Sequence, residues 1–596
     1  MTASAQAMGR TTTGVSRWAL LAAFSLSLGA FAATPELKTL NNLVSELLTI
    51  QAQRLEAEAT FEFTNPRAGW VWVSSTVQAA KTMTIGLDSE PLLTHQGAGT
   101  LESMRFLTKG DHRLTAKAAS PATLESLLVR SIPELVYARF GGDPLVPEFG
   151  KYDWQFLKKH VLPNINVMVG GGQDEEMPYV KEWKAHGGRW IIECEVPGLS
   201  SGATVTADQA EQFWSQHFGM TNRLLDGVIA DEFVETDGAK YAAWTQAVQR
   251  MGTNEALKGK RFYPYYTASP LGPEPNRAFL KAVMEAGWPI AWEKYLPEPR
   301  DEDPPEAKLD RHLRKPFAAW RQAMPGIEQH LIVCLGTFSL PPESLDHSPR
   351  KNYKVYLDKQ MNLLATDAVF SGLYGVMTYT ASYTDEETVR WMGKLFRHYC
   401  VEGRTNLLST DPYLLTHVSN PDFEDALHGW TVDAAESGSV AARKMEGFSW
   451  LQGRYPRTTN GNSVLWMKRS AERPNVVSQT IKALTPGRLY SLRMYSGDFQ
   501  DLSLKQKHAI TVALTGAEVL PGKSFQNVFA NCYSHHWGPF DDKHRAWMNY
   551  HWVIFRATHT EAALRISDWA SERAPGGPTG QELMMNFVEV QPYDPD

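Results

Sequence analysis

The chain has 596 residues, of which 43% are hydrophobic and 21% are charged, and its formal net charge at pH 7 is −7. This length predicts about three or four domains of roughly 100 to 250 residues each. Because the balance is acidic and no basic stripe occurs, nucleic acid and anionic membrane surfaces are excluded as expected partners.

The first 32 residues have the pattern of a secretory signal peptide. Arg10 and Arg17 precede an apolar run from Trp18 to Phe31, and Ala30-Phe31-Ala32 supplies the small-x-small pattern that signal peptidase reads. We therefore expect a secreted or periplasmic protein without membrane attachment after cleavage. The alternative is an uncleaved anchor, although the apolar run is short for a bilayer.

Two patterns follow before residue 131. Residues 33–59 repeat leucine at helical spacing, which predicts an amphipathic helix. Residues 60–130 change to alternating segments such as ATFEFTN and GWVWVSS, separated by Asn-Pro, Gly and Lys-Gly turns. This second pattern predicts a small antiparallel β-sandwich.

Residues 131–402 alternate strand-like and helix-like segments. The candidate strands are ELVYARF, NINVMVGG, RWIIECEV, GVIADEF, RFYPYYTA, PIAWEKY, HLIVCLG and GVMTYTA. Eight alternations in about 270 residues are typical of a (β/α)8 TIM barrel, and an open doubly wound sheet is the alternative. We prefer the barrel because no strand is followed by a phosphate-binding glycine loop.

The last third of the chain changes pattern again. After a linker at residues 403–415, residues 416–596 carry short alternating strands, which predicts a β-sandwich or jelly roll. The opening Asn420-Pro421-Asp422-Phe423-Glu424, with Gly429-Trp430 and a closing strand ending Val588-Glu589-Val590, resembles jelly-roll carbohydrate-binding modules of secreted glycoside hydrolases. The resemblance implies polysaccharide binding and a role for Glu424 in holding a structural calcium ion.

The fourth barrel strand carries the most informative acids. The segment LDGVIADEF, residues 225–233, ends in adjacent Asp231 and Glu232, and TIM-barrel active sites lie at the C-terminal ends of strands. Alternation places Val228, Ala230 and Glu232 on one face, which we assign to the lumen because its residues are small. We expect Glu232 at the mouth as general acid, with Asp231 assisting beside it or held by the next loop.

Hydrolysis of a glycosidic bond needs a second carboxyl group. Strand six supplies Glu293 as nucleophile or base, while its neighbour Lys294 points to the other face of the strand. Glu195, at the end of strand three, is a third candidate that we place in substrate binding. The alternative for each acid is a solvated or ion-paired residue on the rim.

Aromatic rings at the strand ends are candidates for stacking on sugar faces. We select Tyr266, Trp292 and Tyr379, with core packing as the alternative for each. Arg139, at the end of strand one, is a candidate for hydrogen bonding to sugar hydroxyls or to an acidic substituent. An ion pair is its alternative.

No motif predicts a catalytic metal or a required cofactor. Cys194, Cys334, Cys400 and Cys532 lack zinc-binding spacings, and the first two lie in strand-like runs where buried thiols are expected. His535-His536-Trp537 is a conspicuous cluster, but we assign no metal to it.

The barrel resembles glycoside hydrolases with a catalytic acid on strand four, through Asp226-Gly227 and Asp231-Glu232. The adjacent acids are closer to the hexosaminidase pattern than to the chitinase-like one, and acids on strands four and six resemble the alpha-galactosidase-like clan. No single family fits throughout. The resemblance implies a glycosidase acting on a polysaccharide or oligosaccharide; the alternatives are a non-catalytic polysaccharide-binding protein and a polysaccharide lyase.

Overall fold

Strands begin at Lys38, almost at the start of the described chain. The computed structural model describes residues 37–78, 82–139, 142–199, 204–234, 238–269, 272–299, 303–448, 461–531, 541 and 543–596. Residues 37–596 form one unit by their mutual contacts. The expected signal peptide and the His535-His536-Trp537 cluster lie outside the described residues, so both stay predictions.

Two antiparallel sheets form the N-terminal sandwich, with strand orders β1-β2-β9-β4-β7 and β3-β8-β5-β6. Alternation puts Val73, Leu114 and Leu127 into one fully buried core between the sheets. The strands are β1 Lys38–Thr39, β2 Ser45–Leu55, β3 Glu58–Asn65, β4 Gly69–Gln78, β5 Met83–Leu87, β6 Glu90–His95, β7 Gly99–Leu107, β8 Gly110–Ala118 and β9 Ala122–Ile132.

The helix expected over residues 33–59 is wrong, because the described part of this segment forms β1, β2 and the start of β3 and contains no helix. β2 pairs antiparallel with β9, from Ser45 opposite Ser131 to Leu55 opposite Ala122. Helix propensities differ by only up to about 0.7 kcal/mol per residue for ordinary residues. The ladder hydrogen bonds and the sandwich core that β9 provides outweigh this local preference.

Eight parallel strands close into a barrel in the order in which they occur in the chain. All eight predicted strands are present, and the pairing of β10 with β19 closes the barrel and rules out the open sheet. The strands are β10 Glu134–Ala138, β11 Val167–Gly170, β12 Arg189–Cys194, β13 Gly227–Phe233, β14 Arg261–Tyr266, β15 Ile290–Lys294, β16 Leu331–Gly336 and β19 Gly375–Tyr379.

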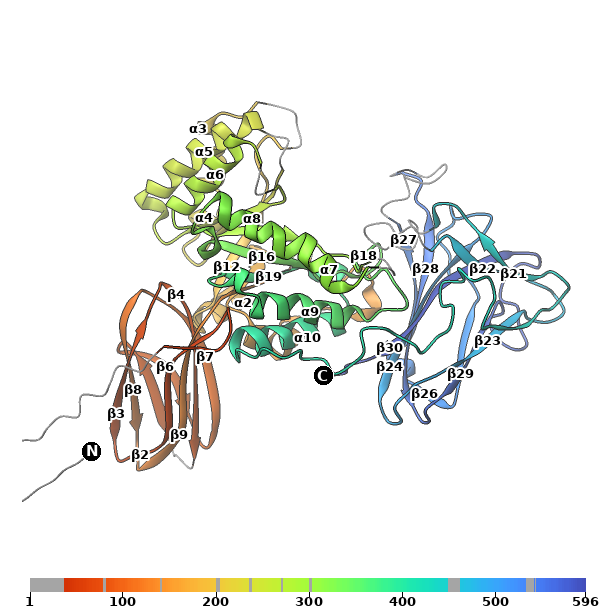
Figure 1. Cartoon of the computed structure of the whole chain (residues 1–596), viewed down its shortest axis with the longest axis horizontal. Coiled ribbons are helices and arrows are strands. Elements are labelled where there is room, and N and C mark those ends of the chain that lie inside the picture. The colour runs from red at the N-terminus through yellow and green to blue at the C-terminus, as the bar shows by residue number, and fades with distance from the viewer. Residues whose placement is uncertain are drawn as a thin grey trace, which may run out of the picture. The chain divides into compact units, whose positions relative to one another are not determined.

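Helices follow the barrel strands and pack on their outer faces (Figure 1). Phe233 of β13, for example, lies 5.2 Å from Trp244 and 4.7 Å from Phe279 by ring centroids. The helices are α1 Trp154–His160, α2 Met177–Ala185, α3 Ala207–Ser215, α4 Phe218–Thr221, α5 Gly238–Thr253, α6 Glu274–Glu285, α7 Pro305–Leu309, α8 Lys315–Ala323, α9 Tyr353–Thr366 and α10 Glu386–Leu395. A short hairpin, β17 Ser339–Leu340 with β18 Glu343–Ser344, lies in the loop between β16 and α9.

The C-terminal region forms a second sandwich, with sheet orders β20-β23-β29-β25 and β21-β22-β30-β24-β28-β26, and β27 also paired to β28. Leu492, Ile566 and Val588 belong to the core that both sheets share. The strands are β20 Thr431–Asp433, β21 Val440–Lys444, β22 Ser463–Lys468, β23 Val476–Ile481, β24 Leu489–Asp498, β25 Thr511–Thr515, β26 Ala517–Val519, β27 Phe525–Ala530, β28 Trp547–Ala557, β29 Ala562–Ser567 and β30 Glu582–Pro592.

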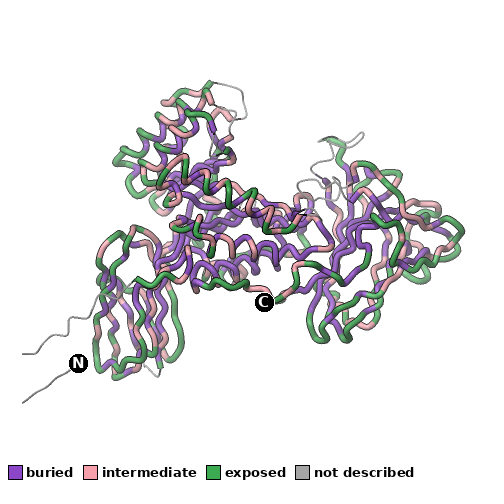
Figure 2. Tube along the Cα trace, viewed as in Figure 1, coloured by how far each residue is buried: buried purple, intermediate pink, exposed green. Residues whose placement is uncertain are grey.

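Burial follows the strands of the barrel and of both sandwiches (Figure 2). Cys194 and Cys334, which we expected as buried thiols, are buried and free, as is Cys400. Among the residues that the structure describes, no helix is long and apolar enough to cross a membrane.

Candidate active site

One face of each barrel strand lines the lumen, and the register identifies that face. Glu193 of β12 lies opposite Ile229 of β13, which in turn lies opposite Tyr263 of β14. The Tyr263 hydroxyl donates a hydrogen bond to Glu134 Oε1 of β10 at 2.8 Å, so it crosses the interior of the barrel. Asp231 follows Ile229 by two residues and therefore faces the lumen as well.

The expectation that Val228 and Ala230 face the lumen is wrong. Val228 points to helix α4, where its Cγ1 lies 2.8 Å from the position that a Cβ on Gly219 would take. The residues on this face are small because α4 approaches β13 closely: the same Cβ would lie 2.4 Å from the Gly227 carbonyl oxygen. Small side chains here make room for a helix and do not mark the lumen.

Glu232 occupies a β-bulge at the end of β13. The register with β14 shifts between Ala230 and Phe233, and Glu232 has φ of 60°. This left-handed conformation costs a non-glycine residue about 1 to 2 kcal/mol. The bulge turns Phe233 outward onto Trp244 and leaves Glu232 exposed at the mouth. Bulges and strained residues of this kind are concentrated at functional sites.

Glu293 of β15 is the most perturbed acid of the lumen. Its Oε2 is buried and, in the described part of the chain, has no hydrogen-bond partner. Burial raises the pKa of Glu293 to about 8, and the charges of Glu232 and Asp231 add to the rise. Lys294 points away as expected, with its Nζ 4.4 Å from the centre of the Trp292 ring. Glu293 is therefore held in its neutral form at pH 7.

Asp231 and Glu193 complete the acidic cluster. Burial raises the pKa of Asp231 to about 6, with a further contribution from Glu232. Burial and the charge of Asp231 raise the pKa of Glu193 to about 7. The sequence analysis missed Glu193 and selected Glu195; both side chains are exposed, and Glu195 lies beyond the end of β12. Alternation in WIIECEV puts both glutamates on one face, and Glu193 lies earlier on the strand, where the charge of Asp231 acts on it.

Four aromatic residues form what we call the aromatic wall: Tyr265, Tyr295, Phe338 and Tyr379. The hydroxyls of Tyr265 and Tyr295 lie 2.5 Å apart, and the Tyr265 hydroxyl is 3.0 Å from Cys334 Sγ. Tyr379 stacks on Tyr295 with ring centroids 5.4 Å apart and planes 14° apart, while Phe338 lies 4.8 Å from Tyr295. Of the three rings selected from sequence, Tyr379 alone belongs to this wall.

Tyr266 and Trp292 lie between the barrel strands and helix α8, not at the mouth. Both side chains have no exposed surface, and both pack against Trp320 at centroid distances of 5.7 and 6.1 Å. Their assignment to substrate binding is therefore corrected to core packing, the alternative that strand alternation had left open.

Arg139 is held in an ion pair. Its Nη1 lies 3.1 Å from Glu176 Oε1, and both side chains are mostly buried. Arg139 Nε and Glu176 Oε2 are buried without hydrogen-bond partners among the described residues. The ion pair is the alternative considered above for Arg139, and it places the guanidinium beside the loop that follows β11.

The described residues contain no group of three or more His, Cys, Asp and Glu side chains arranged to hold a metal ion. Glu424 accepts hydrogen bonds from Gly461 N at 2.9 Å and from Ser463 Oγ at 2.8 Å. These contacts leave the calcium ion at Glu424 a prediction.

Comparisons with known proteins find only weak structural likeness. No protein-family model and no curated protein matches this sequence. A ruminal GH26 endo-beta-1,4-mannanase is 11% identical with a TM-score of 0.24, over 56% of this chain and 88% of its own. A GH2 beta-galacturonidase from Eisenbergiella tayi is 9% identical with a TM-score of 0.29, over 60% and 91%. The TmCBM61 domain, solved with beta-1,4-galactotriose, is 12% identical with a TM-score of 0.17, over 30% and 97%. Likeness at this level assigns no function to this chain.

Proposed function

We propose that this protein is a glycoside hydrolase in which Glu293 is the general acid and Asp231 is the nucleophile or base. The observation that carries the proposal is that two carboxyl groups of the lumen differ in pKa. The pKa of Glu293 is raised to about 8 and that of Asp231 to about 6. Two carboxyls with different pKa values supply one proton donor and one carboxylate near pH 7.

The surroundings of each acid favour its role. Glu293 has a buried oxygen without a partner, which suits a group that gives its proton to the oxygen of a leaving sugar. Asp231 lies two strands away on β13, so a sugar ring in the lumen would have one carboxyl on each side. The negative charge of Glu232 supports the neutral form of Glu293 from the mouth. This assignment moves the acid role from Glu232 to Glu293.

The aromatic wall supports a saccharide as the substrate. Sugars present flat CH faces, which pack on aromatic rings, and their hydroxyls pair with carboxylates and phenols. Tyr379 and Tyr295 are only partly buried, whereas Tyr265 and Phe338 are buried, and the charges of Asp231 and Glu193 act on Tyr379. A polysaccharide or an oligosaccharide is the substrate that this combination fits best.

A lyase is less well supported than a hydrolase. Lyases of this kind need a base such as a tyrosinate, and burial raises the pKa of Tyr265, Tyr295 and Tyr379 far above the ordinary value. These phenols therefore stay protonated at neutral pH and are poor bases.

The test is reducing-end release from a panel of plant, algal and microbial polysaccharides. We expect the parent to release reducing ends, and Glu293→Gln and Asp231→Asn each to lose about a hundredfold or more in kcat. Glu285→Gln, which changes an exposed acid on α6, is the matched control and keeps parental activity. Full activity in both lumen variants would sink the assignment. Binding of a polymer without release of ends would favour a non-catalytic binding protein.

A further inference from the structure

One face of the C-terminal sandwich is covered by loops of the barrel. On β24, β28 and β30, the side chains that point away from the sandwich core form a separate apolar cluster, which includes Tyr550 and Phe587. Val146 and Leu340, from the barrel loops after β10 and β16, are fully buried in this cluster. Because those loops follow barrel strands, the sandwich contacts the end of the barrel that carries the acids.

Aromatic contacts add to this interface. Phe149, in the loop after β10, lies 5.0 Å from Phe525 of β27 and 5.4 Å from Trp552 of β28 by ring centroids, both edge to face. Such pairs contribute about 0.5 to 1.5 kcal/mol each beyond the area that they bury. The covered face is therefore an internal interface and is not open to a polysaccharide.

A buried ion pair joins the sandwich to the loop after β16. Arg493 of β24 has a side chain that is only 2% exposed, and its Nη2 lies 2.5 Å from Glu589 Oε1 of β30. The same nitrogen forms an ion pair with Asp346, whose side chain is 1% exposed. Burial alone would lower the pKa of Arg493, but the Glu589 carboxylate raises it above the ordinary value. Arg493 therefore stays charged and binds a carboxylate on each side of the interface.

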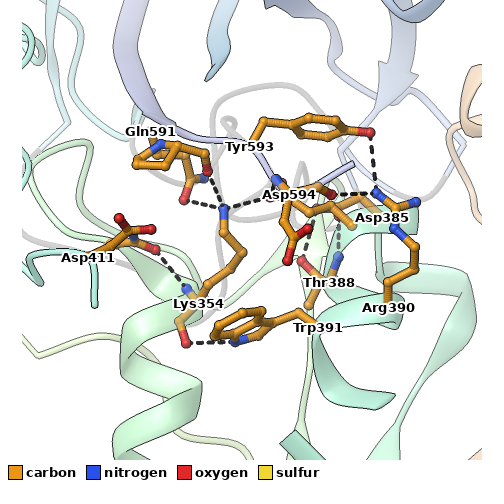
Figure 3. Close-up of polar contacts among 12 residues, drawn as sticks. Lys354, Asp385, Thr388, Arg390, Trp391, Asp411, Gln591, Tyr593 and Asp594 are labelled. Carbon is orange, nitrogen blue, oxygen red and sulfur yellow. Dashed lines mark hydrogen bonds and ion pairs between the residues drawn. The ribbon is translucent and has the colours of Figure 1, made fainter. Parts of the chain in front are cut away.

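The end of β30 and the two residues after it also contact helices α9 and α10 (Figure 3). Lys354 of α9 donates to Gln591 Oε1 at 3.0 Å and to the Pro592 carbonyl at 2.9 Å. Arg390 of α10 donates to the Asp594 carbonyl at 2.8 Å and to the Tyr593 hydroxyl at 3.3 Å. The barrel and the sandwich are thus also joined by hydrogen bonds at residues 591–594.

The loop after β16 connects this interface to the active site. Phe338 at its start belongs to the aromatic wall and lies 4.8 Å from Tyr295. Two residues later Leu340 is buried in the cluster shared with the sandwich, and Asp346 at its end pairs with Arg493. Within the loop, Leu345 N donates to the Phe338 carbonyl at 3.0 Å, which holds residues 338 and 345 next to each other.

We propose that the C-terminal sandwich is a positioning domain for the active site, in which Arg493 holds the loop of residues 337–346, through Asp346, so that Phe338 completes the aromatic wall. This inference rests on the proposed function for its substrate, a saccharide stacked on that wall. It assigns the β24, β28 and β30 face to the barrel and not to polysaccharide binding. Arg493 touches no substrate in this scheme and acts only through the loop.

Asp346→Asn is the sharpest variant, because Glu589 still balances Arg493 and the sandwich keeps its own ion pair. We expect KM to rise about tenfold and kcat to stay within about twofold, since the lumen acids are on barrel strands and do not move. Arg493→Met is expected to raise KM in the same way. Arg493→Lys, which keeps the positive charge, is expected to bring KM most of the way back to the parental value. The control is Asp433→Asn, which removes a solvent-exposed ion pair with Arg473 within the C-terminal domain. It is expected to leave KM and kcat unchanged.

Amide hydrogen exchange tests the same inference without turnover. In Asp346→Asn, residues 337–346 are expected to exchange about tenfold faster than in the parent, while β12 and β13 are unchanged. Unchanged exchange in this loop, or a fall in kcat at constant KM, would overturn the positioning role. If no saccharide is hydrolysed by the parent, the proposed function fails, but the exchange result still decides whether Arg493 holds the loop.

Discussion

Asp231 and Glu293 face the same lumen from β13 and β15, with β14 between them, and the charge of Asp231 raises the pKa of Glu293. The charge of Asp231 therefore favours the neutral form of Glu293 that protonation of a leaving group needs, in addition to burial and the charge of Glu232. Such coupling makes the pH profile the most direct readout of the site.

We expect kcat/KM to follow a bell-shaped curve with limbs near pH 6 and pH 8. Activity rises as Asp231, with a pKa of about 6, loses its proton, and it falls as Glu293, with a pKa of about 8, loses its own. Initial rates from about pH 4 to pH 10 measure both limbs. A profile without an alkaline limb would remove Glu293 from the acid role.

Glu232→Gln is expected to keep most of the activity and to shift the curve to lower pH. The charge of Glu232 contributes to the raised pKa of both Asp231 and Glu293, so its removal lowers both values. The measurement is the same pH profile on the variant. A loss of about a hundredfold at all pH values would instead make Glu232 the acid, as the sequence alone had suggested.

Glu293→Gln is expected to stabilise the fold at alkaline pH. A carboxyl whose folded pKa is raised from 4.5 to about 8 contributes stability that is present below about pH 4.5 and is lost as the pH rises to about 8. Glutamine does not ionise, so the variant should melt about 2 to 4 °C above the parent at pH 8 and near the parent at pH 5. Calorimetry at the two pH values decides this, with Glu285→Gln as the control. An equal difference at both pH values would contradict the raised pKa.

Trp292→Ala and Tyr379→Ala should separate core packing from substrate binding. Trp292 is fully buried against Trp320, so its removal costs about 3 to 5 kcal/mol of unfolding free energy in urea. Tyr379 is partly exposed beside the acids, and its removal is expected to raise KM about tenfold. A raised KM without lost stability in Trp292→Ala would return that ring to the substrate site.

Strand positions were predictable because each barrel strand is a short apolar run bounded by turn residues, and GVIADEF and HLIVCLG fall in β13 and β16. Which side chains of a strand point into the lumen was not predictable from their size. The small residues of β13 accommodate Gly219 of α4, and the bulge at Glu232 breaks the alternation that was used to extrapolate from Val228.

Glu193 and Phe338 show two ways in which a residue of the candidate site escapes sequence reasoning. Glu193 was hidden by a neighbour of the same type, Glu195, which lies just beyond the end of β12. Phe338 belongs to a loop whose position depends on Arg493, more than 150 residues later in the chain, and no local pattern reports that contact.

Local patterns were sufficient to locate the eight barrel strands and to bring Asp231 and Glu293 to the same end of the barrel, because alternation and strand order are short-range properties of a chain. The three-dimensional structure decided the rest: β2 as a strand, Asp231 as the inward acid, and the covered face of the C-terminal sandwich. These depend on partners distant in sequence, such as β9 for β2 and Asp346 for Arg493. Pairing and burial energies of that kind arise only once the chain has folded.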